Sequence, residues 1–199
     1  MQILLVRHGA TDWNLQGRCQ GSTDMALNEV GLQQAVEMAA SLRSEVITAL
    51  YSSNLTRALQ TAELIGRARN LPVVIEERFR ELNHGALEGL TFSEIHEQYP
   101  EFIRKWKAEP AELLIPGGER LVDVDKRAWD GMDQITGRHG ADETVLVVTH
   151  NFPILAILCR ISNRSLNQYR TFRLDPCSLS RVSYDTSDGW RIVQPNDRG

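Results

Sequence analysis

The sequence predicts an α/β protein, a single three-layer α/β/α domain built around a mostly parallel sheet of about six strands. Short runs of aliphatic and β-branched residues alternate with longer segments whose apolar residues recur at helical spacing. Two of the strand-like runs, 3–6 and 144–149, are unbroken, as expected for strands covered by helices on both faces. The length of 199 residues fits one domain spanning 1–199.

The chain begins with a predicted strand and a predicted helix. The strand covers 2–6 and ends at the polar turn Arg7-His8-Gly9, so this tripeptide lies at the carboxyl end of a strand. The helix covers 28–42, with Asn28 as its N-cap. The apolar residues expected on its core face are Leu32, Ala35, Val36, Ala39 and Leu42.

A second strand, a second helix and a third strand follow. The strand is predicted near 47–51, and Ser52-Ser53-Asn54 opens the helix, which places Arg57 in its first turn. Pro72 bars continuation of the helix, and a short strand is predicted at 73–75. The residues expected on the core face of the helix are Leu55, Ala58, Leu59, Ala62, Ile65 and Ala68.

The pattern weakens between residues 92 and 116, a stretch that we predict to be a short insertion or lid. It carries Glu-rich helical patches with aromatic residues interleaved. At helical spacing, aromatic residues such as Tyr99, Phe102 and Trp106 more often form local core than contact a substrate.

The remaining elements complete the sheet. A helix at 121–135 precedes the apolar run 144–149, which is predicted to be a central parallel strand ending at His150. An apolar helix follows at 152–161. Two final strands, which flank a polar turn, are predicted at 179–184 and 190–193.

Composition and charge exclude several classes of partner. With 22 Lys and Arg against 26 Asp and Glu, the formal charge is −4, and no basic block could neutralise a row of phosphates, so no nucleic-acid partner is expected. No apolar run is long enough for a membrane span or a signal peptide, so the expected location is the cytoplasm, with no membrane partner. Three widely spaced cysteines predict neither a disulfide framework nor a metal site, and Cys159 is expected to be a buried apolar residue.

Six polar groups lie in loops or at helix starts that the predicted topology places at one edge of the sheet. Ligands of open α/β sheets bind beyond the carboxyl ends of the strands, so we expect these groups to meet there. Arginine forks fit phosphate oxygens, asparagine adds a neutral donor, and neutral imidazole is a nucleophile that needs no metal. Helix N-termini after Ser52 and Asn151 would also favour an anion. The combination indicates phosphoryl transfer. The six groups are Arg7, His8, Asn14, Arg57, Glu81 and His150.

Five segments of the chain form a series of motifs. They are LLVRHGATDWN at 4–14, YSSNLTRALQTAE at 51–63, RELNHGALEGLT at 80–91, PGGE at 116–119 and VLVVTHN at 145–151. In order and spacing, these segments resemble the successive motifs of the histidine phosphatase superfamily, which has the phosphoglycerate mutase-like fold. The segment 172–193 resembles the closing hairpin of that family.

The resemblance implies a role for each site residue. His8 matches the nucleophile that becomes phosphorylated, and Glu81 matches the proton donor, which would then activate water as a base. His8 must be neutral at its attacking nitrogen, with its other N–H held by an acceptor that we expect to be a backbone carbonyl. Burial and the incoming phosphate would help Glu81 to hold a proton. The phosphate-binding groups that the resemblance implies are Arg7, Arg57, His150 and Asn14, with Gln20 and Gly21 on a loop near the substrate.

Three positions depart from the family's common pattern, and none of them removes a catalytic group. Arg120 stands where serine is frequent, Leu87 where an aromatic residue is common, and Asn151 where many relatives have glycine. Asn151 is still expected to contribute to substrate binding through its backbone N–H, with a side chain that narrows the pocket.

Neither a metal nor an organic cofactor is expected. Glu81 and His84 are three residues apart, but neighbouring glycines make this segment a loop, and no second such pair exists. His96 and His139 are expected in solvent. His139 belongs to a second Arg-His-Gly, which shows that the tripeptide alone does not make a site.

The leading interpretation is a metal-independent phosphatase whose partner is a small phosphorylated metabolite. One alternative is a 2,3-bisphosphoglycerate-dependent phosphoglycerate mutase, which would use the same His8 and Glu81 but return the phosphoryl group to the product; such relatives are generally longer. Another is a catalytically silent protein that only binds a phosphorylated ligand, whose expected mark would be a missing nucleophile or arginine. Because dimers are common in this fold, a homodimer stays open.

Overall fold

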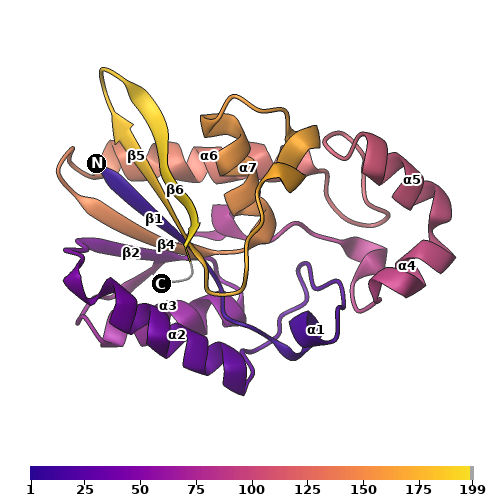
Figure 1. Ribbon diagram of the computed structural model, residues 1–199, viewed down its shortest axis with the longest axis horizontal. Helices are drawn as coiled ribbons and strands as arrows, with labels where there is room; N and C mark the ends of the chain where they lie inside the picture. The colour runs from indigo at the N-terminus through magenta and orange to yellow at the C-terminus, as the bar shows by residue number, and fades with distance from the viewer. Residues whose placement is uncertain (198–199) are drawn as a thin grey trace.

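The computed structural model describes residues 1–197 and contains, within them, a six-stranded sheet in the order β3-β2-β4-β1-β5-β6 (Figure 1). The first four strands of that order are parallel. β5 runs antiparallel to β1, and β6 runs antiparallel to β5. The prediction of an α/β domain with a mostly parallel sheet is confirmed. The strands are β1 (Gln2–Arg7), β2 (Ala49–Ser52), β3 (Val73–Ile75), β4 (Thr144–Thr149), β5 (Leu179–Asp185) and β6 (Gly189–Asp197).

Helices cover both faces of the sheet and complete three layers (Figure 1). The main helices are α2 (Glu29–Ser41) and α3 (Thr56–Arg67) on one face, and α6 (Leu121–Arg138) and α7 (Asn151–Ile161) on the other. In β1, Ile3 and Leu5 pack into the α6 and α7 side, whereas Leu4 and Val6 pack into the α2 and α3 side. Two-sided burial of this kind explains why β1 and β4 lack the polar alternation of a half-exposed strand.

Helix α2 begins where predicted, but its buried face is rotated. Asn28 caps it by accepting a hydrogen bond from the backbone N–H of Gly31. Leu32 and Val36, which were predicted in the core, are 41% and 50% exposed, so that part of the prediction is wrong. The cause is Gly31, which packs so closely on the preceding loop that a Cβ would lie 2.1 Å from the carbonyl oxygen of Ala10.

Helix α3 begins at Thr56, later than predicted, with Leu55 in the N-cap position. The Ser53 hydroxyl accepts the N–H of Leu55 at 3.3 Å, so Ser53 shapes the turn before the helix. Ala68 lies past the helix end and is exposed, contrary to its predicted place in the core. A short helix that was not predicted, α1 (Asp12–Leu15), is closed by a capping box with Thr11.

Two short helices, α4 (Phe92–Gln98) and α5 (Pro100–Ala108), lie beyond the carboxyl ends of the parallel strands (Figure 1). The Trp106 indole N–H donates to the Tyr169 hydroxyl at 3.1 Å, which joins α5 to the segment after α7. Within residues 1–197, none of the helices is both long and apolar enough to cross a membrane. The 3₁₀ turns are η1 (Leu42–Ser44), η2 (Glu77–Phe79), η3 (Gly85–Leu87) and η4 (Leu166–Thr171).

Candidate active site

The two predicted site histidines lie side by side at the carboxyl ends of neighbouring strands. β1 and β4 pair in parallel with Arg7 opposite Thr149, so the next residues, His8 and His150, meet at one edge of the sheet. Their ring centroids are 5.1 Å apart, and both side chains are buried. The register of two buried strands therefore places an imidazole pair at the predicted crevice.

Hydrogen bonds define the protonation state of His8. Its Nδ1 lies 2.7 Å from the carbonyl oxygen of Gly9, which can only accept, so Nδ1 carries the proton. Its Nε2 accepts from the Arg57 Nε–H at 3.3 Å. Burial, and then the charges of Arg57 and Arg7, hold the pKa of His8 well below its ordinary value. The ring is neutral, with a lone pair on Nε2 and its other N–H held by a backbone carbonyl, as predicted.

Arg57 is a fully buried cation that also organises the loop facing His8. Its Nη1 and Nη2 donate to the carbonyl oxygens of Thr23 and Gly21 at 2.9 and 2.7 Å. Burial lowers its pKa to about 10, which still leaves it charged at neutral pH. Gly21 has φ of +55°, and a Cβ there would lie 2.1 Å from Oε1 of Glu88, so this loop requires glycine.

Several nitrogens at the site have no hydrogen-bond partner within residues 1–197 although they are buried. They include Arg7 Nε, Gln20 Nε2 and His150 Nδ1. Arg7 is otherwise held by one bond, from Nη1 to the carbonyl oxygen of Leu174 at 2.7 Å. Because unpaired buried donors are unfavourable, this cluster is arranged for a ligand rich in acceptor oxygens.

Asn14 and His150 are oriented by neighbouring hydroxyls. Asn14 Oδ1 accepts from the backbone N–H and the hydroxyl of Thr11 at 3.0 and 3.1 Å, which leaves its amide N–H groups for the cavity. His150 Nε2 lies 2.8 Å from the Ser53 hydroxyl. Burial, followed by the charge of Arg57, holds the pKa of His150 well below its ordinary value, so this ring is neutral too. The sequence carried no signal for the role of Ser53 beyond its place in a helix-opening turn.

The Glu81 carboxylate lies at the N-terminus of α7. Its Oε1 accepts from the backbone N–H groups of Leu82 and Phe152 at 2.9 and 3.0 Å, and its Oε2 accepts from that of Asn151 at 3.1 Å. The backbone N–H of Asn151 thus points to Glu81, contrary to the expectation that it serves a bound phosphate. Asn151 nevertheless lines the cavity.

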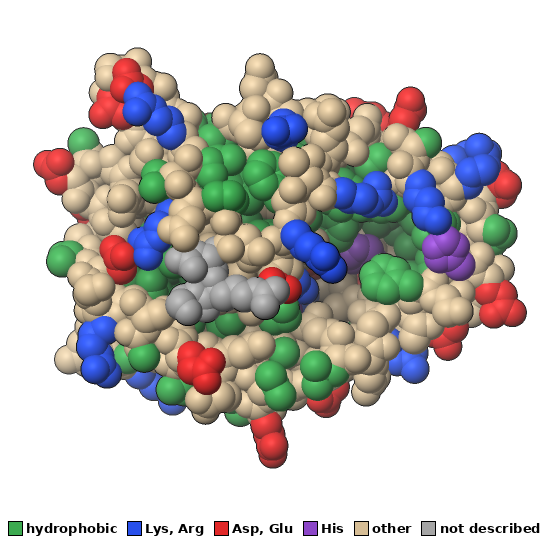
Figure 2. Space-filling view, in the orientation of Figure 1, with side chains coloured by type: hydrophobic (Ala, Val, Ile, Leu, Met, Phe, Trp, Pro, Cys, Tyr) green, Lys and Arg blue, Asp and Glu red, His purple; other side chains and the backbone are tan. Residues whose placement is uncertain are grey.

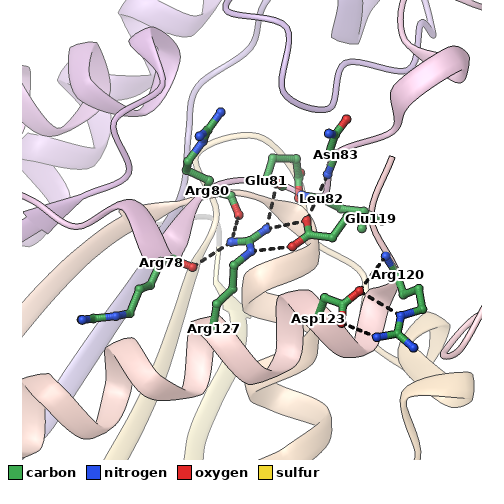
Figure 3. Close-up of polar contacts among 9 residues, drawn as sticks. All are labelled: Arg78, Arg80, Glu81, Leu82, Asn83, Glu119, Arg120, Asp123 and Arg127. Atoms are coloured by element: carbon green, nitrogen blue, oxygen red, sulfur yellow. Dashed lines mark hydrogen bonds and ion pairs between the residues drawn. The ribbon is translucent and has the colours of Figure 1, made fainter. Parts of the chain in front are cut away.

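The backbone that carries Glu81 is clamped by Arg127, a residue that the sequence did not single out. Arg127 forms a two-pronged ion pair with Glu119, with N···O distances of 2.9 and 3.0 Å. The same guanidinium donates to the carbonyl oxygens of Arg78, Arg80 and Glu81 (Figure 3). Glu119 belongs to the PGGE motif, but nothing in the sequence distinguishes Arg127 from other charged residues of an amphipathic helix.

A cavity of about 780 Å³ brings the predicted residues together. Eight of the nine line its wall, and His150 lies directly behind His8. Figure 2 shows a hollow with basic side chains beside it and hydrophobic and histidine side chains within it. The eight lining residues are Arg7, His8, Asn14, Gln20, Gly21, Arg57, Glu81 and Asn151.

The other histidines differ from one another in their surroundings. His96 is exposed, as predicted, although it borders the cavity. His139 is half-buried, contrary to prediction, because its ring bonds to the Tyr51 hydroxyl at 2.9 Å and to Glu143 at 3.0 Å. Within the described part of the chain, no group of three or more His, Cys, Asp or Glu residues is arranged to hold a metal ion.

Protein stability is expected to fall on mild acidification because His8 and His150 are buried as neutral rings. The unfolded chain binds a proton on each histidine as the pH drops through about 6.5, whereas the folded protein, with lowered pKa values, does not. The free energy of unfolding should therefore be constant above that pH and decrease below it, by up to about 1.4 kcal/mol per pH unit for each ring.

Urea denaturation at about pH 7.5, 6 and 5 measures this loss. His8→Asn, which removes one of the buried rings whose pKa is lowered, should have a shallower decrease. The exposed His96→Asn is the matched control and should keep the slope of the parent protein. An unchanged free energy of unfolding across this range would contradict the assignment of neutral buried rings.

Comparison with known proteins yields one family. The model of the histidine phosphatase superfamily (branch 1) matches residues 3–198. The chain is 37% identical over 182 residues to phosphoserine phosphatase 1 of Hydrogenobacter thermophilus, covering 92% of this chain and 86% of that protein. It is 33% identical over 201 residues to a probable phosphoglycerate mutase, GpmB, of Yersinia pestis, covering 99% and 93%. The solved structure of YhfR of Bacillus stearothermophilus matches with a TM-score of 0.90 at 31% identity, covering 97% of this chain and 95% of that one.

Proposed function

The chain belongs to branch 1 of the histidine phosphatase superfamily, and from this membership we propose that it is a metal-independent phosphatase for small phosphomonoesters. One observation carries the proposal: a neutral His8, whose Nε2 is unprotonated and accepts a hydrogen bond from Arg57, lines a cavity together with Arg57, Arg7 and Glu81. A neutral imidazole among fixed cations is suited to attack phosphorus without prior deprotonation.

In the first step, His8 Nε2 attacks the phosphorus of the bound ester in line with the leaving oxygen. A P–N bond forms as the ester P–O bond breaks, and a protonated Glu81 delivers its proton to the leaving oxygen. Arg7 and Arg57 stabilise the equatorial phosphoryl oxygens. His150, Asn14 and Gln20 contribute neutral donors that are already oriented by the protein.

In the second step, water cleaves the phosphohistidine. The Glu81 carboxylate accepts a proton from the water, the water oxygen bonds to phosphorus, and the P–N bond breaks, which releases inorganic phosphate and restores neutral His8. The three backbone N–H groups that orient the Glu81 carboxylate support its role as this base.

A phosphoglycerate mutase is the second candidate, favoured by the 33% identity to a probable mutase. It would use the same His8 and Glu81 but return the phosphoryl group to a phosphoglycerate instead of water. A catalytically silent binding protein is the least supported alternative, because every residue that the mechanism requires is present.

The proposal is tested by incubating the protein with a panel of phosphomonoesters in the presence of a metal chelator. The panel contains phosphoserine, 3-phosphoglycerate, glycerol 3-phosphate and aryl phosphates. We expect inorganic phosphate to be released at the same rate with and without chelator. Isomerised phosphoglycerate without phosphate release would instead identify a mutase, and loss of activity with chelator would contradict the metal-independent mechanism.

A further inference from the structure

The cavity is much larger than a phosphoryl group. At about 780 Å³, it falls in the range of sites that enclose whole drug-sized ligands. In the proposed mechanism Arg7, His8, Arg57 and Glu81 surround the phosphoryl group. Residues of α4 and α5 also line the cavity, and these helices lie away from the carboxyl ends of β1 and β4 (Figure 1), so their side is the far end of the cavity. The rest of the cavity therefore faces the leaving group of the substrate.

That far end has an aromatic wall built from several separate elements. Phe102 and Trp106 of α5 stack with centroids 5.6 Å apart, and Phe152 of α7 packs on Tyr169 of η4 at 5.5 Å. The Trp106 indole N–H donates to the Tyr169 hydroxyl, so the Trp106 ring offers the cavity no free donor. Phe92 of α4 also lines the cavity although its side chain is 69% exposed. A wall of this kind favours a flat apolar body.

Three exposed cations, Lys107, Arg170 and Arg173, border the same cavity. None of the three forms an ion pair with any residue within 1–197. The Arg170 guanidinium lies 4.7 Å from the centroid of the Tyr169 ring, so it is held over the aromatic wall. Among residues 1–197, the acidic residues that line the cavity are Glu81 and Asp175. In a chain of net charge −4, this local excess of cations indicates a second anionic group on the ligand.

We propose that the far end of the cavity is a leaving-group subsite for phosphomonoesters of an aromatic alcohol that carries a second anionic group. The inference rests on the proposed phosphatase function and names the class of its substrate. The aromatic body would cover Phe92, Phe102 and Trp106, and the second anion would meet Lys107, Arg170 and Arg173. A small polar ester such as phosphoserine would bind near His8 and would leave the aromatic wall exposed to water.

Four synthetic esters separate the two halves of the proposal. Phenyl phosphate and 2-naphthyl phosphate differ in apolar area, and each is paired with a derivative that bears a carboxylate on the ring position farthest from the ester oxygen. We expect kcat/KM to rise about tenfold or more from phenyl to naphthyl. The carboxylate should add about threefold or more through KM, an advantage that decreases with added salt.

Variants with matched controls assign these effects to residues. Phe92→Ser should lower the naphthyl-to-phenyl ratio of kcat/KM, and Arg173→Gln combined with Lys107→Gln should bring the carboxylate advantage close to one. Leu114→Ser is the control for Phe92→Ser, because Leu114 is an apolar residue exposed to a similar extent as Phe92 but does not line the cavity. Arg104→Gln removes a neighbouring α5 cation that pairs with Glu101. Both control variants should keep the ratios of the parent protein.

The outcomes distinguish this inference from the function on which it rests. Phosphate release that is equally fast from phosphoserine, phenyl phosphate and the naphthyl esters would overturn the subsite and leave the phosphatase intact. Carboxylated esters that are no better than the neutral ones would overturn the anionic part of the substrate class. Absence of phosphate release from every ester would overturn both proposals.

Discussion

His8→Asn is expected to reduce kcat for phosphomonoester hydrolysis by about 10⁴-fold or more, because it removes the atom that bonds to phosphorus. The asparagine side chain keeps an N–H donor that can replace the hydrogen bond from His8 Nδ1 to the carbonyl oxygen of Gly9, so the fold should be retained. Rapid-quench measurements with labelled substrate report the acid-labile phosphoenzyme directly. The parent protein should accumulate label on His8, and the variant should not.

His139→Asn is the matched control, since His139 lies in the same Arg-His-Gly tripeptide but does not line the cavity. Its kcat should stay close to that of the parent protein, with any loss confined to stability, because the ring bonds to Tyr51 and Glu143. Label that persists in His8→Asn would refute His8 as the nucleophile. Equal losses in both variants would point to a general effect of removing a histidine.

Glu81→Gln is expected to have the second largest effect, and its size should depend on the leaving group. For alkyl phosphates, whose leaving oxygen needs a proton, we expect kcat to fall by about 10²- to 10⁴-fold. For p-nitrophenyl phosphate, whose leaving oxygen is stable without a proton, transfer to His8 should be almost unaffected. Single-turnover rates for both ester types measure this difference.

The clamp around Glu81 offers a test of positioning. Arg127→Lys removes the two-pronged ion pair with Glu119, so the backbone that carries Glu81 is held less firmly. As in Glu81→Gln, the rate should fall more for alkyl phosphates than for p-nitrophenyl phosphate, but the loss should be smaller. Arg120→Lys is the matched control, since Arg120 pairs with Asp123 (Figure 3) and with Glu112 instead. Equal losses for alkyl and p-nitrophenyl esters in Glu81→Gln would exclude proton donation as the role of Glu81.

Much of the fold was predictable because its signals are local. The strands β1 and β4 are unbroken apolar runs, Asn28 caps α2 as predicted, and the short strand β3 lies at Val73–Ile75 as expected. The convergence of His8, Arg57 and His150 followed from a general rule about the carboxyl edges of parallel strands. The predicted buried face of α2 was wrong. The close contact of Gly31 with the preceding loop sets the orientation of the helix, and the spacing of its apolar residues does not.

The candidate site shows the same division. Residue types and order were sufficient to nominate the nucleophile, the cations and the acid. They could not reveal three hydrogen bonds that the structure shows. The Asn151 backbone N–H donates to Glu81, the Ser53 hydroxyl bonds to the His150 ring, and Arg127 donates to the backbone carbonyl of Glu81. Each of these contacts joins residues tens of positions apart, and none is marked by an unusual residue type.

By itself, the sequence determined the class of fold, the order of its elements and the candidate residues for phosphoryl transfer, because apolar periodicity, turn residues and motif spacing are properties of short segments. Only the tertiary structure decided the chemistry available to them. It made His8 neutral, with Nε2 as the acceptor of a hydrogen bond from Arg57, since burial and Arg57 act on it together. It also assembled aromatic rings from α4, α5, α7 and η4 beside cations that form no ion pair within residues 1–197. These properties depend on distances between segments remote in the chain, which the packing of the whole molecule sets.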